Sequence, residues 1–276
     1  APAFTLDGNS IKLTGQGGQK VIMVNNSGNI QTVNMDVELG ANGKIDAAAA
    51  AIVVGGDISG DYSLTKIGGS QLTLSGNNSH TGGTIINAGN VVLGSSTALA
   101  GGNLTLGGGS LNLGSATHTV GAVSVTAAAG SGNTIHSGGL TANSYAVSAA
   151  NDVAISANLG GGSAGLAKSG AGTLTLSGTN TYAGLTNVSA GTLKLGSAGA
   201  LPIGNVTVDG TLDLNGNSAT IKALNGTGTG LVTTSGSSAV ALTVGDGDAS
   251  GTFSGEIRDG PPAFTTLDPR VAALQF

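Results

Sequence analysis

The chain of 276 residues has no cysteine and no tryptophan, and aromatic residues make up only 3% of it. The absence of cysteine removes any inference about the cellular compartment from disulfides. The scarcity of aromatic side chains means that a core has to be built from leucine, valine, isoleucine and alanine. We therefore expect a slender stack of small apolar side chains.

Charge is also scarce, because charged residues are 8% of the chain and the formal net charge is −5. Nine lysines and arginines and an isoelectric point near 4.9 are the opposite of the basic footprint that nucleic-acid binding requires. A positive mean hydropathy of +0.25 with modest net charge predicts a folded chain. The longest apolar run, from Ala47 to Val54, is too short to span a bilayer, for which about 20 residues are needed.

Glycine is abundant, with 51 of the 276 residues, and it separates short apolar-polar alternations such as Leu72-Thr73-Leu74. These alternations recur every 19–20 residues, in two interleaved series. Short strands at this spacing, joined by corners rich in glycine and asparagine, predict an all-β chain folded as a single-stranded right-handed parallel β-helix. The predicted inward ladder comprises Leu72, Leu74, Val91, Leu93, Leu104, Leu106, Leu174, Leu176, Leu193, Leu195, Val206, Val208, Leu212 and Leu214.

One stretch of the chain occurs twice. Residues 64–94 align without a gap on residues 166–196, and 15 of the 31 aligned positions are identical. The identical residues are mostly leucine, glycine, threonine and alanine, so the feature that repeats is architectural rather than catalytic.

The second copy resembles the autotransporter-associated β-strand repeat of bacterial surface-protein passengers. The matching positions are Lys168, Gly170, Gly172, Leu174, Leu176, Gly178, Asn180, Tyr182, Gly184, Ala190, Gly191, Leu193 and Leu195. The first copy departs from the pattern at Gln71 and His80, where the pattern has threonine and tyrosine. The resemblance implies a passenger-like β-helix outside a bacterial cell, secreted or on the cell surface, and it transfers no catalytic residue.

The two ends of the sequence carry similar segments, Pro2–Asp7 and Pro262–Asp268, which differ by one inserted threonine. We expect three regions: a cap or assembly segment at 1–20, the β-helix at 21–260, and a tail or assembly segment at 261–276. Strand edges at the ends of a β-helix have unpaired backbone groups and are natural sites of joining. The candidate assembly residues are Pro2, Phe4, Leu6, Pro262, Phe264 and Leu267.

Candidate chemical motifs are weak. The stretch Gly161–Gly165 matches the Gly-x-Ser-x-Gly pattern around Ser163, but no helix is expected after it, as a nucleophile elbow demands. His80, His118 and His136 are expected to face solvent, because their spacing only loosely meets a metal-ligand pattern.

Acidic residues form two local pairs, Asp246 with Asp248 and Asp209 with Asp213. Calcium at the first pair is improbable, because the nonapeptide of calcium-binding β-rolls is missing. Lys194 lies 19 residues before Asp213, so we expect the two to stack on neighbouring coils as a surface ion pair. No catalytic, metal or cofactor site is expected.

These observations favour a non-catalytic extracellular structural protein, a rigid β-helical rod that joins end to end with copies of itself into a filament or surface layer. The alternative is an adhesin passenger fragment that binds a host or matrix surface or a surface polysaccharide. A carbohydrate-active β-helix is the least favoured class, because paired titratable groups are scarce. No nucleic-acid partner is expected.

Overall fold

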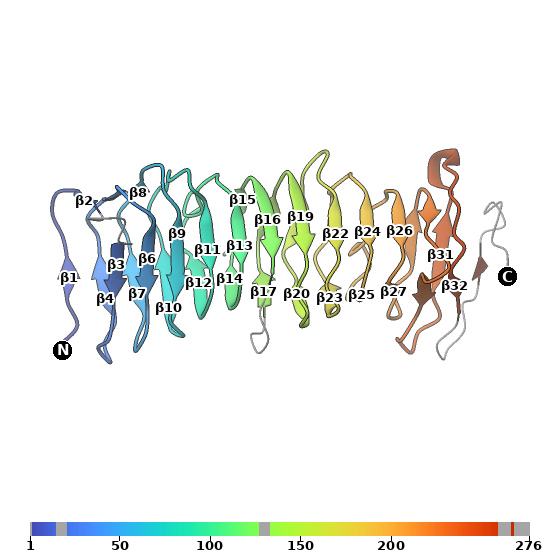
Figure 1. Cartoon of the computed structure of the whole chain (residues 1–276), viewed down its shortest axis with the longest axis horizontal. Coiled ribbons are helices and arrows are strands. Elements are labelled where there is room, and N and C mark those ends of the chain that lie inside the picture. Colours follow the sequence, from blue (N-terminus) through green and yellow to red (C-terminus); the bar gives the residue numbers. More distant parts are fainter. Residues whose placement is uncertain (1, 15–20, 127–132, 259–265, 268–276) are drawn as a thin grey trace. The chain divides into compact units, whose positions relative to one another are not determined.

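A computed structural model describes residues 2–14, 21–126, 133–258 and 266–267 of the chain. Two compact units are present, Ala1–Ala142 and Asn143–Phe276, and the sequence gives no sign of the boundary between them. Within each unit, short parallel strands stack coil upon coil, which confirms the prediction of an all-β parallel β-helix (Figure 1).

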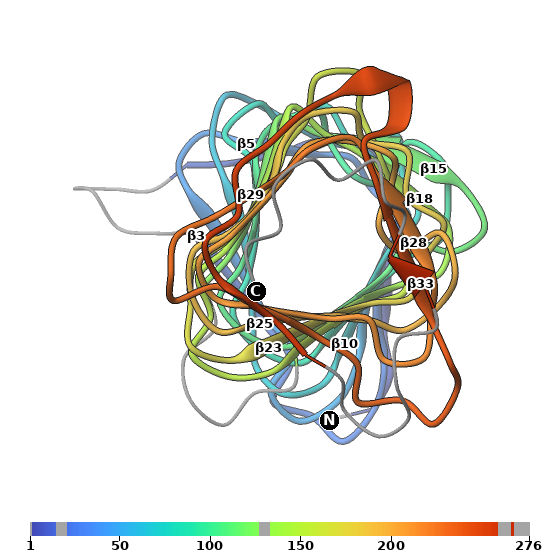
Figure 2. The same ribbon diagram turned by 90° about the vertical axis from the view of Figure 1, so that its right-hand side faces the viewer.

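The first unit has three walls of strands, and β3, β5 and β10 lie on different walls in the end-on view (Figure 2). The wall that holds the Leu-Thr-Leu strand comprises β1 (Thr5–Leu6), β4 (Gln31–Val33), β7 (Ile52–Val54), β10 (Gln71–Leu74), β12 (Asn90–Leu93), β14 (Ser110–Asn112) and β17 (Asn133–His136). The second wall comprises β3 (Val21–Val24), β6 (Gly43–Asp46), β9 (Leu64–Ile67), β11 (Thr84–Ile86), β13 (Leu104–Leu106) and β16 (Ala122–Val125). The third is shorter, with β2 (Ile11–Leu13), β5 (Val37–Leu39), β8 (Ile58–Ser59), β15 (Thr117–Thr119) and β18 (Gly139–Thr141).

The second unit repeats this plan. Its first wall comprises β20 (Val153–Ile155), β23 (Thr173–Leu176), β25 (Thr192–Leu195), β27 (Thr211–Asp213), β30 (Leu231–Thr233) and β32 (Glu256–Ile257). Its second wall comprises β19 (Ser144–Val147), β22 (Leu166–Lys168), β24 (Thr186–Val188), β26 (Val206–Val208) and β29 (Leu224–Asn225). The remaining strands are β21 (Asn158–Gly160), β28 (Ala219–Ile221), β31 (Ala241–Val244) and β33 (Thr266–Leu267), and one 3-10 turn, η1, spans Asp246–Asp248.

The strand registers confirm the predicted coil length where the two repeats lie. Leu72 pairs with Val91, and Leu174 pairs with Leu193, in both cases 19 residues further on. Coils outside the repeats are longer, since Thr5 pairs with Thr32. Corners take residues in the left-handed region, as the Asn-Gly corner predicts: φ is 47° at Asn215 and 78° at Gly216.

The core follows from the two-residue alternation of side chains along each strand. Every residue of the predicted inward ladder is at least 96% buried, which confirms the predicted core. The alternate residues, such as Thr73 and Thr175, lie on the outer surface and are half-buried by their neighbours along the wall. Residues 1–20, expected as a cap or assembly segment, contain β1 and β2, which pair with β4 and β5.

Candidate functional site

The candidate assembly residues at the start of the chain lie on or beside β1. Phe4 is 49% exposed and Leu6 is 42% exposed, and Pro2 is exposed as well. Within the described residues, β1 has a partner strand on one side only, β4. Beneath it lies a cavity of about 220 Å³ whose lining includes Phe4, Leu6, Ile11 and Leu13. This end of the first unit therefore combines a free strand edge with accessible apolar side chains.

The candidate residues near the end of the sequence are less well defined. Pro262 and Phe264 lie outside the described residues. Leu267 belongs to β33 and pairs with Leu242 of β31, beside β28. Thr5 and Leu6 instead pair with β4, on the wall that contains the Leu-Thr-Leu strand β10. The two similar segments therefore sit on different kinds of wall in their own units, which the sequence likeness does not predict.

The prediction that the histidines face solvent is wrong for two of the three. His80 and His118 are each only 1% exposed, whereas His136 is half-buried beside Ser137. The Nε2 atom of His80 lies 3.1 Å from Thr84 Oγ1, and that of His118 lies 3.1 Å from the carbonyl oxygen of Leu113. The repeat held the signal for His80, because the equivalent position in the second copy is Tyr182, which is also buried.

Each repeat also buries an asparagine that links three successive coils. The side chain of Asn78 accepts the N–H of Ile58 at 2.8 Å and donates to the carbonyl of Ala98 at 2.5 Å. The side chain of Asn180 accepts the N–H of Leu159 at 2.8 Å and donates to Ala200 at 2.6 Å. A buried amide with both ends satisfied in this way pins the register of the coils above and below it.

A buried lysine occupies the corner after β9 and after β22. The Nζ atom of Lys66 donates to the carbonyls of Ile67 at 2.7 Å, Gly68 at 2.6 Å and Ala88 at 3.2 Å. Burial lowers the pKa of Lys66 to about 8, and the nearby Asp46 opposes that shift. A Cβ at Gly89 would stand 2.8 Å from this Nζ, so the lysine and the glycine of the next coil require one another.

The second repeat reproduces this lysine corner. Lys168 donates to the carbonyls of Gly170 and Ala190, and burial lowers its pKa, with Asp152 opposing the shift. A Cβ at Gly191 would lie 2.5 Å from Lys168 Nζ. The lysines of the repeat pattern therefore act inside the coil, on backbone carbonyls, and offer no charge to an external ligand.

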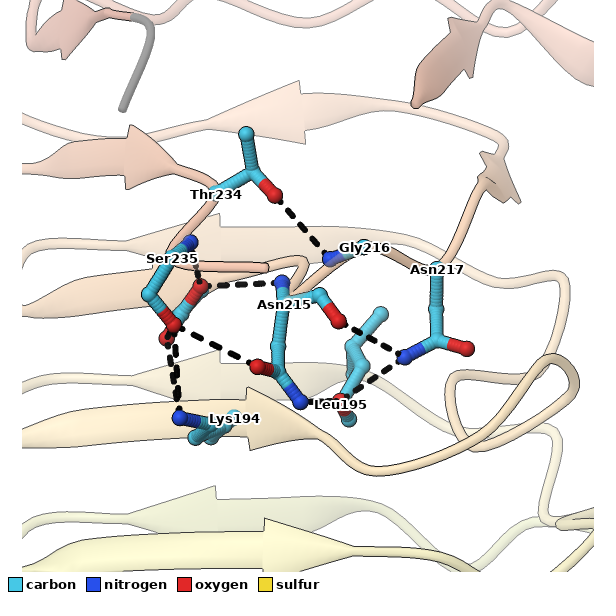
Figure 3. A network of polar contacts seen from close by, with 8 residues as sticks. Lys194, Leu195, Asn215, Gly216, Asn217, Thr234 and Ser235 are labelled. Atoms are coloured by element: carbon cyan, nitrogen blue, oxygen red, sulfur yellow. Dashed lines mark hydrogen bonds and ion pairs between the residues drawn. The ribbon is translucent and has the colours of Figure 1, made fainter. Parts of the chain in front are cut away.

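The predicted ion pair between Lys194 and Asp213 is confirmed, with Nζ 3.8 Å from Oδ2 on neighbouring strands (Figure 3). Asp213 does more than pair with the lysine. Its Oδ1 accepts the N–H groups of Asn215 at 2.9 Å and Ser235 at 2.8 Å, and its Oδ2 accepts the Ser235 hydroxyl at 2.6 Å. Asn215 in turn donates to the carbonyl of Leu195 at 2.9 Å. All of these contacts join neighbouring coils, so the cluster is a corner fastening.

Other acidic groups serve in the same way. Asp57 accepts the N–H of Asn77 at 2.6 Å, and Asp152 accepts that of Thr173 at 2.8 Å. Asp209 Oδ1 accepts the N–H and the hydroxyl of Thr227, both at 2.8 Å, and these bonds lower the pKa of Asp209. In the described part of the chain, no group of three or more histidine or acidic side chains is placed to hold a metal ion.

The Gly-x-Ser-x-Gly stretch lacks the geometry of a nucleophile elbow. Residues 161–165 form a turn between β21 and β22, with Ser163 exposed and a strand rather than a helix after it. Asp246 and Asp248 form the short turn η1, and both are exposed. Among the described residues, no helix is long and apolar enough to cross a membrane.

Comparison with known proteins agrees with the repeat pattern. The family model of the passenger-associated-transport repeat matches residues 64–93 and 166–195. Adhesin BmaC autotransporter from Brucella suis biovar 1 (strain 1330) is 38% identical over 91 residues, which are 31% of this chain and 3% of that protein. No solved structure matches the chain. The chain thus carries two passenger-associated-transport repeats of the autotransporter type, both folded into coils of a parallel β-helix.

Proposed function

We propose that this chain is a segment of the passenger of a surface-exposed or secreted bacterial autotransporter adhesin, in which the β-helix is a non-catalytic scaffold. The observation that carries the proposal is the use of polar side chains in the two repeats. Lys66, Asn78, Lys168 and Asn180 are buried and bind backbone groups of their own and neighbouring coils. These residues hold the solenoid together and leave the outer surface free to carry recognition. The chain spans only 3% of its adhesin relative, so the binding target belongs to this proposal alone.

Surface exposure is tested on the source cells with antibodies raised against the purified chain. We expect intact cells or their culture medium to carry the epitope, and external protease to remove it from the cells. Labelling that appears only after permeabilisation would contradict the proposal.

Adhesion is tested with beads coated with the folded chain and applied to host cells and to immobilised matrix proteins. Beads coated with the same chain after heat unfolding are the control. Binding by the folded chain above that control supports an adhesive role. Equal binding by both would show that this segment is a stalk without an adhesive face of its own.

The scaffold role also predicts inertness. The purified chain is expected to cleave neither polysaccharides nor esters, because the candidate groups are exposed without a partner, as Ser163 is, or bound into corners, as Asp213 is. Turnover that disappears in Ser163→Ala or Asp213→Asn while the fold is retained would overturn it.

A second proposal is end-to-end joining of copies through the first coil. The free edge of β1, the exposed Phe4 and Leu6 and the cavity beneath them favour it. We expect the double variant Phe4→Asp/Leu6→Asp to remove any concentration-dependent association in sedimentation. Ile203→Asp, at an exposed apolar site of the second unit, is the matched control. A chain that stays monomeric at high concentration, or association equal in both variants, would contradict joining at this edge.

A further inference from the structure

Two histidines in the interior of the first unit have no role in the proposals above. His80 and His118 are buried among apolar side chains, and each binds a partner through Nε2 alone. The partner of His118 is the carbonyl of Leu113, which can only accept, so Nε2 carries the proton. The Nδ1 atoms of both rings are buried and have no hydrogen-bond partner among the described residues.

The second repeat supplies an internal comparison. At the position equivalent to His80 it has Tyr182, whose hydroxyl lies 3.0 Å from Thr186 Oγ1, just as His80 Nε2 lies 3.1 Å from Thr84 Oγ1. Burial raises the pKa of Tyr182 further above its ordinary value, so this side chain stays neutral in acid. None of the three histidines lies in residues 143–276. The same place in the coil is therefore titratable in the first unit and not in the second.

The surroundings offer no charge to stabilise a protonated ring. Burial lowers the pKa of His80, opposed only by the backbone carbonyl of Ile58, and burial lowers the pKa of His118, opposed only by that of Leu113. No aspartate, glutamate, lysine or arginine contributes to either shift. The groups that face the rings are the hydroxyl of Thr84 and these backbone carbonyls.

We propose that the first unit contains an acid-sensitive joint at the coils of His80 and His118, which open on acidification while the second unit stays closed. Adding a proton to Nδ1 places an N–H and a charge in an apolar interior without a partner. The opened coil exposes the ring to water, where it takes up the proton near its ordinary pKa of about 6.5. The stabilisation by the neutral rings is therefore complete above about pH 6.5 and is lost as the pH falls below that value.

Hydrogen exchange of the full chain, followed by mass spectrometry at about pH 7.5 and about pH 5.5, tests the joint. At the lower pH most carboxylates remain ionised, since their ordinary pKa values are about 4. After correction for intrinsic exchange rates, we expect protection in residues 78–125 to fall by up to about tenfold for each histidine. Residues 180–208, the matched coils of the second unit, should keep their protection.

Variants separate the joint from general acid weakening. His80→Gln retains a polar group that can reach Thr84 and should remove most of the acid response of residues 78–106. His136→Gln, at a half-buried ring beside Ser137, should behave as the unaltered chain. Tyr182→His should transfer the response to residues 180–208, so the idea remains testable if the substitution at position 80 prevents folding. Equal loss of protection in both units, or an unchanged response in both His80→Gln and Tyr182→His, would overturn the proposal.

Discussion

At the scale of the residue, the stability of the β-helix depends on a few buried polar side chains that reach both neighbouring coils. Asn180→Ala leaves the N–H of Leu159 and the carbonyl of Ala200 without partners inside the solenoid. We expect the free energy of unfolding of its coils to fall by about 2–4 kcal/mol, since each unsatisfied buried group costs about 1–3 kcal/mol. Urea denaturation followed by circular dichroism measures the loss.

Asn158→Ala is the matched control for that substitution. Asn158 also accepts an N–H of the next coil, that of Thr179 at 2.8 Å, but it does so at the exposed surface, where water replaces it. Its loss should cost less than about 1 kcal/mol. Equal losses in the two variants would show that burial of the amide is not what makes Asn180 important.

The same residues mark what the sequence alone can and cannot predict. Leucine and valine at every second position predicted the core, because apolar periodicity at a fixed coil length has one physical reading. The buried His80, Lys66 and Asn78 ran against the general preference of polar side chains for the surface. Their burial depends on carbonyls and N–H groups of neighbouring coils, and those contacts exist only once the register is known. The sequence could have indicated His80 only through its alignment with Tyr182.

At the scale of the element, one inward position on a strand tests the register of a whole wall. Leu176 is completely buried in β23, so Leu176→Asp forces an unpaired charge into the apolar stack. We expect a loss of more than about 4 kcal/mol in the second unit. Thr175→Asp is the matched control, because Thr175 faces outward and pairs with Lys194 on β25, where a carboxylate is favourable. A melting curve unchanged by Leu176→Asp would contradict the register.

At the scale of the whole molecule, the chain should lose its structure in parts. In a solenoid each coil contacts only its neighbours, so the effect of a defect falls off with the number of coils that separate it from a given strand. The chain also has two compact units, each with its own run of buried leucine and valine residues. Local opening free energies should therefore differ between the units when one of them carries a defect.

Leu176→Asp makes that difference measurable by hydrogen exchange at neutral pH. We expect the loss of amide protection to be greatest in β20, β23 and β25, which lie on the same wall in consecutive coils around the substituted position. Strands β4, β7 and β10 of the first unit should keep the protection that they have in the unaltered chain, because their apolar contacts are made within that unit. The reciprocal variant Leu74→Asp, in the first unit, should produce the opposite pattern, since Leu74 is the equivalent buried position of the first repeat. Uniform loss of protection along the chain in both variants would show that the two units unfold as a single cooperative body, and the nearest-neighbour description of this β-helix would then be wrong.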